Sequence, residues 1–93
     1  MDTKKNIEKL WNYIDGMFEE DHLEWAMKEF DIAPDRVKPD TIAALNEEEA
    51  RILLSDLGYM TVNGLLGGDF GTWNEILQNN LKFDKETIDF LDY

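Results

Sequence analysis

The chain has 93 residues, which fits one domain, and 43% of them are hydrophobic, enough for one modest core. It contains no cysteine, which excludes disulfides, zinc–thiolate sites and thiol nucleophiles. Its 21 acidic and 9 basic residues give a net charge of −12, which disfavours direct binding to nucleic acid or to an anionic membrane, because both require a basic surface.

The longest uninterrupted apolar run covers only residues 42–45, so we expect neither a signal peptide nor a membrane-spanning segment. The lack of cysteine is compatible with a reducing cytoplasm, and a cytoplasmic location is therefore our expectation. The strong acidity has two interpretations. It attracts a basic protein surface, or it reflects only solubility or a salt-rich host.

The first predicted helix covers residues 3–20, with Asp2 or Thr3 as its N-cap. Its apolar side chains recur at helical spacing and form one stripe, made of Ile7, Leu10, Trp11, Ile14, Met17 and Phe18. The opposite, solvent-facing side carries Glu8, Asn12, Asp15 and Glu19. No lysine or arginine offsets the acids near the end of this helix, which are Asp15, Glu19, Glu20, Asp21 and Glu24.

The second predicted helix begins at Asp21, with Glu24 completing a capping box. One face of this helix is apolar and carries Leu23, Ala26, Met27 and Phe30, while Trp25 lies nearly opposite. Residues 31–40 contain both prolines and are interpreted as a connector, with a single helical turn at Pro34–Val37. Asp40 or Thr41 then starts a short apolar turn that runs through Leu45.

Residues 46–58 are predicted to form the central helix. Asn46 and Glu49 match a capping box, and Gly58 matches a left-handed C-terminal cap. Four apolar side chains share one face of this helix, namely Ala50, Leu53, Leu54 and Leu57. Ile52 points the other way, which predicts a second contact behind the helix.

The pattern is looser after Gly58. Residues 59–66 fit either a short helix or an extended segment, and residues 67–71 are predicted to form a flexible glycine-rich loop. Thr72 and Glu75 match a capping box for a helix whose apolar side carries Trp73, Ile76, Leu77 and Leu81. Asp84 caps a last helix with Ile88 and Leu91. The predicted fold is all-α, a compact single-domain bundle of four to six short helices over residues 1–93.

No motif predicts a cofactor, a metal or catalysis. Glu19 and His22 have the Glu-x-x-His spacing of di-iron bundles, but such sites need a second copy and this is the only histidine. The glycine-rich loop before Thr72 is followed by no lysine, and Asp69 would repel a phosphate. We therefore expect no cofactor, no metal site and no catalytic residues, in a protein that is not an enzyme.

An acidic surface and an outward-facing tryptophan are the remaining signals. In one continuous helix, Glu8, Asp15 and Glu19 would be separated by about 10.5 and 6 Å along the axis. Phosphates on a DNA strand have spacings of the same order. The expected partner-binding residues are Glu8, Asp15, Glu19, Glu20, Asp21, Glu24 and Trp25. In the alternative interpretation the charges form an ordinary solvated face and another element covers Trp25.

The sequence thus favours a non-catalytic module whose acidic face docks on a basic protein, a nucleic-acid-binding complex being one case. The specific hypothesis is an inhibitor that imitates nucleic-acid phosphates, a property of small phage-borne inhibitors of host defence nucleases, although no residue motif identifies them. The alternative is an assembly or immunity partner that binds through apolar contacts around Trp25, with the acidity incidental.

Overall fold

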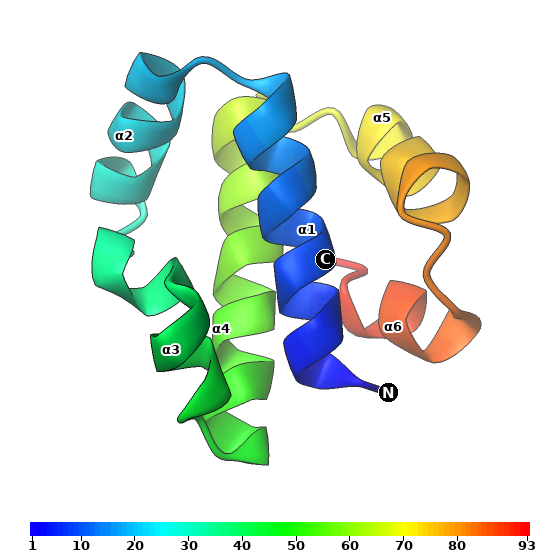
Figure 1. Ribbon diagram of the computed structural model, residues 1–93. Coiled ribbons are helices and arrows are strands. Elements are labelled where there is room, and N and C mark those ends of the chain that lie inside the picture. The colour runs from blue at the N-terminus through cyan, green and yellow to red at the C-terminus, as the bar shows by residue number, and fades with distance from the viewer.

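The computed structural model describes all 93 residues and confirms the predicted all-α fold. Six α-helices follow one another along the chain (Figure 1): α1 Thr3–Met17, α2 Glu20–Glu29, α3 Pro39–Ala43, α4 Glu47–Met60, α5 Phe70–Glu75 and α6 Lys85–Phe90. A 3₁₀ turn, η1 (Pro34–Val37), precedes α3, as the prolines predicted. Two π-helical turns, η2 (Thr61–Leu65) and η3 (Ile76–Asn80), directly continue α4 and α5.

The helices α1 and α4 pack side by side at the centre of the molecule, with α2, η1 and α3 on one side and α5 and α6 on the other (Figure 1). Their predicted apolar faces are buried, including Ile7, Leu10 and Ile14 of α1 and Leu53 and Leu57 of α4. The 22 buried hydrophobic residues form one continuous cluster. No helix is both long enough and apolar enough to span a bilayer.

The boundary between the first two helices differs from the prediction. The first helix ends at Met17 rather than at residue 20, and Phe18 and Glu19 adopt extended backbone conformations. The second helix begins at Glu20, so Asp21 lies in its first turn and forms no capping box with Glu24. Because α1 ends at Met17, this side chain lies outside the core, and 58% of its surface is exposed.

The central helix begins as predicted and ends differently. Asn46 Oδ1 accepts a hydrogen bond from the Glu49 N–H at 2.8 Å, and the Asn46 N–H donates to Glu49 Oε1 at 2.9 Å. The predicted left-handed cap at Gly58 is wrong, because α4 continues to Met60 and then into η2. The second contact expected behind the helix is also wrong, since Ile52 is 52% exposed.

Gly58 instead gives the C-terminal segment room to approach α4. A β-carbon at this buried position would lie 2.7 Å from Tyr93 Oη and 2.9 Å from Leu91 Cδ2. The Tyr93 hydroxyl donates a hydrogen bond to the Ser55 carbonyl at 2.6 Å, and Trp73 Nε1 donates to the Leu91 carbonyl at 3.0 Å. These contacts fasten the end of the chain to α4 and α5.

Of the two capping predictions for the C-terminal helices, one is confirmed and one is wrong. Asp84 caps α6 by accepting from the Thr87 N–H at 2.9 Å. The N-cap of α5 is Asp69 rather than Thr72, because Asp69 Oδ1 accepts from the Thr72 N–H at 3.0 Å. The loop before it turns through Gly67 and Gly68, which both have positive φ. The ambiguous residues 59–66 are almost entirely helical.

Candidate partner-binding surface

All seven residues expected to bind a partner are exposed. Glu8 and Asp15 belong to α1, Glu19 is the N-cap of α2, and the other four belong to α2 itself. Because α1 and α2 meet through only two extended residues, five of the acids gather at one end of the molecule, drawn at the top of Figure 1. We call this group the acidic corner: Asp15, Glu19, Glu20, Asp21 and Glu24. Glu8 lies two helical turns before Asp15, outside the corner.

The turn between the helices also changes the predicted spacing of the charges. Glu8 and Asp15 lie on one side of α1, about 10.5 Å apart along its axis. Glu19 no longer extends this line, because it stands in the extended link after the helix has ended. The acids therefore follow the turn from α1 into α2 instead of a straight stripe along one helix.

The carboxylates of this region have no partner within the protein. Neither Glu8 nor any acid of the corner forms an ion pair or a side-chain hydrogen bond. No lysine or arginine occurs between Lys9 and Lys28. Elsewhere in the chain nine acidic side chains do have partners: Asp2, Asp35, Glu47, Glu49, Asp56, Asp69, Asp84, Glu86 and Asp89.

The helix termini explain only part of this distribution. Glu20 and Asp21 lie in the first turn of α2, where the helix dipole stabilises a negative charge. Glu19 occupies the N-cap position, but its side chain accepts no hydrogen bond from the helix. The last turn of α1 contains no basic residue, although a cation there would be favourable. The acidic corner thus lacks a side-chain cap at Glu19 and a basic residue in the last turn of α1, although either would be locally more stable.

Trp25 is half exposed beside these acids, so the interpretation in which another element covers it is wrong. Its indole stacks at a tilt on the His22 ring, with centroids 5.8 Å apart. The Phe18 ring also contacts the His22 ring, in an edge-on arrangement with centroids 5.6 Å apart. Met17 adds a further exposed apolar side chain. The sequence did not predict the exposure of Met17, because its position fits the buried stripe of a longer helix. Met17 is exposed because α1 ends earlier than predicted.

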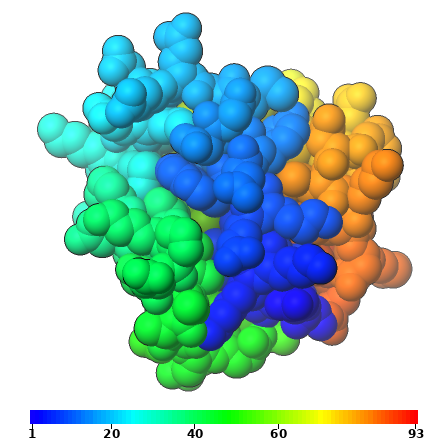
Figure 2. Space-filling model, viewed as in Figure 1, coloured from blue at the N-terminus to red at the C-terminus, as the bar shows by residue number.

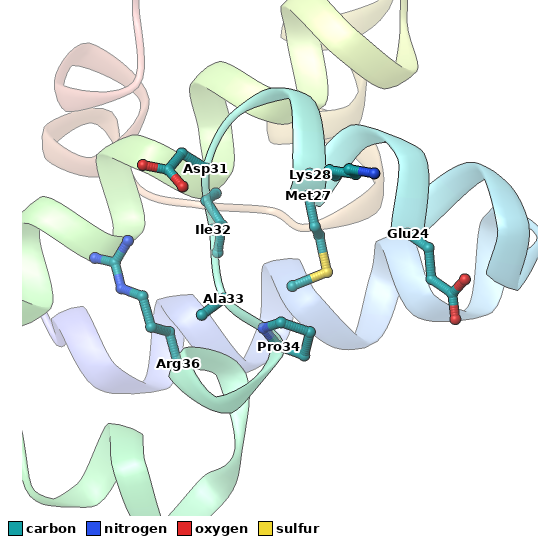
Figure 3. A pocket seen from close by; sticks show the side chains of 8 residues that line it. All are labelled: Glu24, Met27, Lys28, Asp31, Ile32, Ala33, Pro34 and Arg36. Atoms are coloured by element: carbon teal, nitrogen blue, oxygen red, sulfur yellow. The ribbon is translucent and has the colours of Figure 1, made fainter.

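A pocket of about 460 Å³ lies next to the corner, between the end of α2 and η1, and Glu24 is on its rim (Figure 3). Met27 points toward its middle, where Ile32, Ala33 and Pro34 make the wall apolar. The charged side chains around it are of both signs: Glu24, Lys28, Asp31 and Arg36. Arg36 is already paired with Asp56 at 3.3 Å. This mixed rim favours neither an anionic nor a cationic ligand.

The Glu19–His22 pair does not form the di-iron arrangement that its spacing resembles. Glu19 lies in the link before α2 and His22 lies within the helix, where its ring contacts Phe18 and Trp25. No group of three or more histidine, cysteine, aspartate or glutamate side chains that could hold a metal ion is found. Comparison of the chain with protein families, with curated proteins and with solved structures finds no match.

Proposed function

We propose that this protein is a non-catalytic binding module whose acidic corner docks on a basic surface of a partner protein. The observation that carries the proposal is the absence of any internal partner for the five carboxylates of the corner. An unpaired surface charge keeps its full potential for an external cation, and a cluster of such charges steers oppositely charged partners toward it.

The proposed partner class is a protein that normally binds nucleic acid, whose basic groove the corner would occupy in place of phosphates. Clustered carboxylates reproduce the charge of a phosphate backbone, and Glu8 and Asp15 extend the negative surface along α1. In this form the protein would act as an inhibitor, and a phage-encoded inhibitor of a host defence nuclease is the specific case we favour. Double-stranded DNA should then compete with the protein for its partner.

The test compares two variants that remove the same charge from different places. The first carries Glu19→Gln, Glu20→Gln and Asp21→Asn in the corner. The control carries Asp40→Asn, Glu48→Gln and Asp92→Asn, which are also exposed and unpaired. Each set contains two acids from the first turn of a helix, so the expected effects on stability are similar.

Both variants and the wild-type protein are used as bait in lysate from the native host, and the affinity of each captured protein is measured at increasing salt. We expect wild type and control to bind one basic partner with an affinity that falls steeply with salt, and the corner variant to bind it at least about tenfold more weakly. Equal binding by the two variants would refute a role for the corner, because net charge alone would then explain the affinity.

A second candidate function rests on the exposure of Trp25. Tryptophan is enriched among the residues that dominate binding energy, and this one is half exposed. If the protein docks mainly through apolar contact, Trp25→Ala should abolish binding while salt has little effect. Ile52→Ala is the matched control, because Ile52 has a similar exposed fraction and lies on α4.

A further inference from the structure

A groove of about 350 Å³ separates the end of α1 from α5 and η3. Figure 2 shows these two parts of the chain next to each other on the displayed face, α1 in blue and the residues after 70 in orange. We call it the α1–α5 groove and define it by its lining residues: Tyr13, Met17, Phe18, Leu66, Thr72, Glu75, Ile76 and Asn80. It shares Met17 and Phe18 with the helix end that leads into the acidic corner.

The groove is suited to an apolar side chain. Five of its eight lining residues are hydrophobic. The Thr72 hydroxyl already donates a hydrogen bond to Asp69 at 2.6 Å, so it is not free to donate to a ligand. Met17 stands at the edge with more than half of its surface exposed, and its flexible thioether can adapt to different apolar shapes.

One π-helical turn of the chain, η3, lines this groove, and the residue that follows the other, η2, lines it as well. Ile76 and Asn80 are the first and last residues of η3, and Leu66 directly follows η2. The π-helix is rare, and the single π-turns that do occur lie at functional sites with high frequency. The position of the π-turns is an observation separate from the charge distribution, and it marks the same end of the molecule as the acidic corner.

The charges around the groove specify the sign of an occupant. Glu75 is the only charged residue that lines it, and this carboxylate has no ion pair. Glu19 follows the lining residue Phe18 directly in the chain. No lysine or arginine lines the groove. A second copy of this chain is a poor occupant, because each copy carries a net charge of −12.

We propose that the α1–α5 groove receives an apolar side chain of the partner protein, from a segment in which lysine or arginine flanks that side chain. This inference rests on the proposed function, since the flanking cations would contact the acidic corner and Glu75. The apolar anchor would add specificity that the charges alone do not provide, because any basic surface attracts an acidic one.

The test uses three short synthetic peptides and NMR spectra of the isotope-labelled full chain. The first peptide combines lysines with central leucine and phenylalanine. In the second, serine replaces the two apolar residues, and in the third, glutamate replaces the lysines. The methyl signals of Met17 and Ile76 report on the groove, and the backbone signals of Glu19 and Asp21 report on the corner.

We expect the first peptide to shift both sets of signals, and Met17→Ser to weaken its binding about five- to tenfold. Ile52→Ser, at a similarly exposed position on α4, should leave the affinity unchanged. Glu75→Gln should also weaken binding of the first peptide, while Glu48→Gln should leave its affinity unchanged.

Other outcomes separate the groove from the corner. If the serine peptide binds as tightly as the first one and shifts only corner signals, the groove proposal is overturned and the proposed function stands. If the acidic peptide binds the groove equally well, the requirement for a basic segment is wrong. If the first peptide causes no shift in the groove, or if the free protein dimerises through Met17, the groove does not take a basic partner segment.

Discussion

Gly58→Ala separates two explanations for a glycine in the central helix. By helix propensity alone, alanine is more favourable than glycine by about 0.8–1.0 kcal/mol in a helix interior. In this structure the added methyl group would meet Tyr93 Oη at 2.7 Å, Leu91 Cδ2 at 2.9 Å and Trp73 Cζ2 at 3.3 Å. The first two distances are too short for a carbon contact, so the Tyr93 and Leu91 side chains must move away from α4.

The size of the effect follows from these opposing contributions. Forcing an extra carbon into a well-packed core costs about 1–3 kcal/mol. Displacement of Tyr93 also weakens its hydrogen bond to the Ser55 carbonyl, which contributes about 0.5–1.5 kcal/mol. After the gain in helix propensity, we expect the free energy of unfolding to fall by about 0.5–3.7 kcal/mol, a decrease in Tm of about 2–30 °C.

Urea unfolding followed by far-UV circular dichroism measures this change, and Gly16→Ala is the control. Gly16 lies near the end of α1, and a β-carbon there would meet nothing within 4 Å. The control should therefore be stabilised by a few tenths to about 1 kcal/mol. If Gly58→Ala is stabilised as much as Gly16→Ala, the close approach of the C-terminal segment to α4 is wrong.

Three further substitutions test the contacts at the helix ends and the C-terminus. Trp73→Phe should lower the free energy of unfolding by about 1–3 kcal/mol in urea, because the Leu91 carbonyl loses its buried donor; an unchanged midpoint would contradict this. Glu19→Ser should raise the stability of α2 by about 0.5–1 kcal/mol in thermal unfolding, since a serine hydroxyl can cap the helix that Glu19 leaves uncapped. Burial, with the nearby charge of Asp56, raises the pKa of Tyr93 from 10.0 to about 12. The folded state therefore holds this proton longer than the unfolded one, and stability should fall as pH rises from 10 to 12, less steeply in Tyr93→Phe.

The parts of the fold that were predicted correctly depend on short-range patterns. Apolar residues at helical spacing located α1 and α4, and their buried faces follow the predicted periodicity. The caps at Asn46 and Asp84 were predicted because each satisfies a backbone N–H only three residues away. Such interactions are determined by neighbouring residues, and tertiary packing has little influence on them.

The incorrect predictions concern positions where two local patterns compete or where a distant contact decides. Asp69 and Thr72 are both suitable N-caps three residues apart, and in the structure Thr72 donates to Asp69. A glycine after an apolar helical run indicates a left-handed cap as readily as a close helix contact. At Gly58 the choice depends on Leu91 and Tyr93, which are more than thirty residues away in sequence. No sequence signal distinguishes π-turns from ordinary helix.

The sequence predicted the candidate site as a set of charges, but the fold determines which acidic side chains form ion pairs. Lys85 and Asp89 are neighbours on one helix, whereas Arg36 of η1 pairs with Asp56 of α4. Only the structure shows which carboxylates such partners leave unpaired. Likewise, the exposure of Trp25 depends on which elements pack against α2, which the sequence does not state.

The unpaired acids also stand where a more stable choice is available locally. A basic residue in the last turn of α1 would interact favourably with the helix dipole, and a short hydroxyl or amide side chain at position 19 would cap α2. The chain has such devices elsewhere, at Asn46, Asp69 and Asp84. Departures from local stability are concentrated at functional sites in natural proteins, because binding surfaces are selected for their partner. For this reason Glu19→Ser, although stabilising, should bind the partner more weakly than wild type, and a stabilised variant with unchanged affinity would indicate that the charge at position 19 serves no partner.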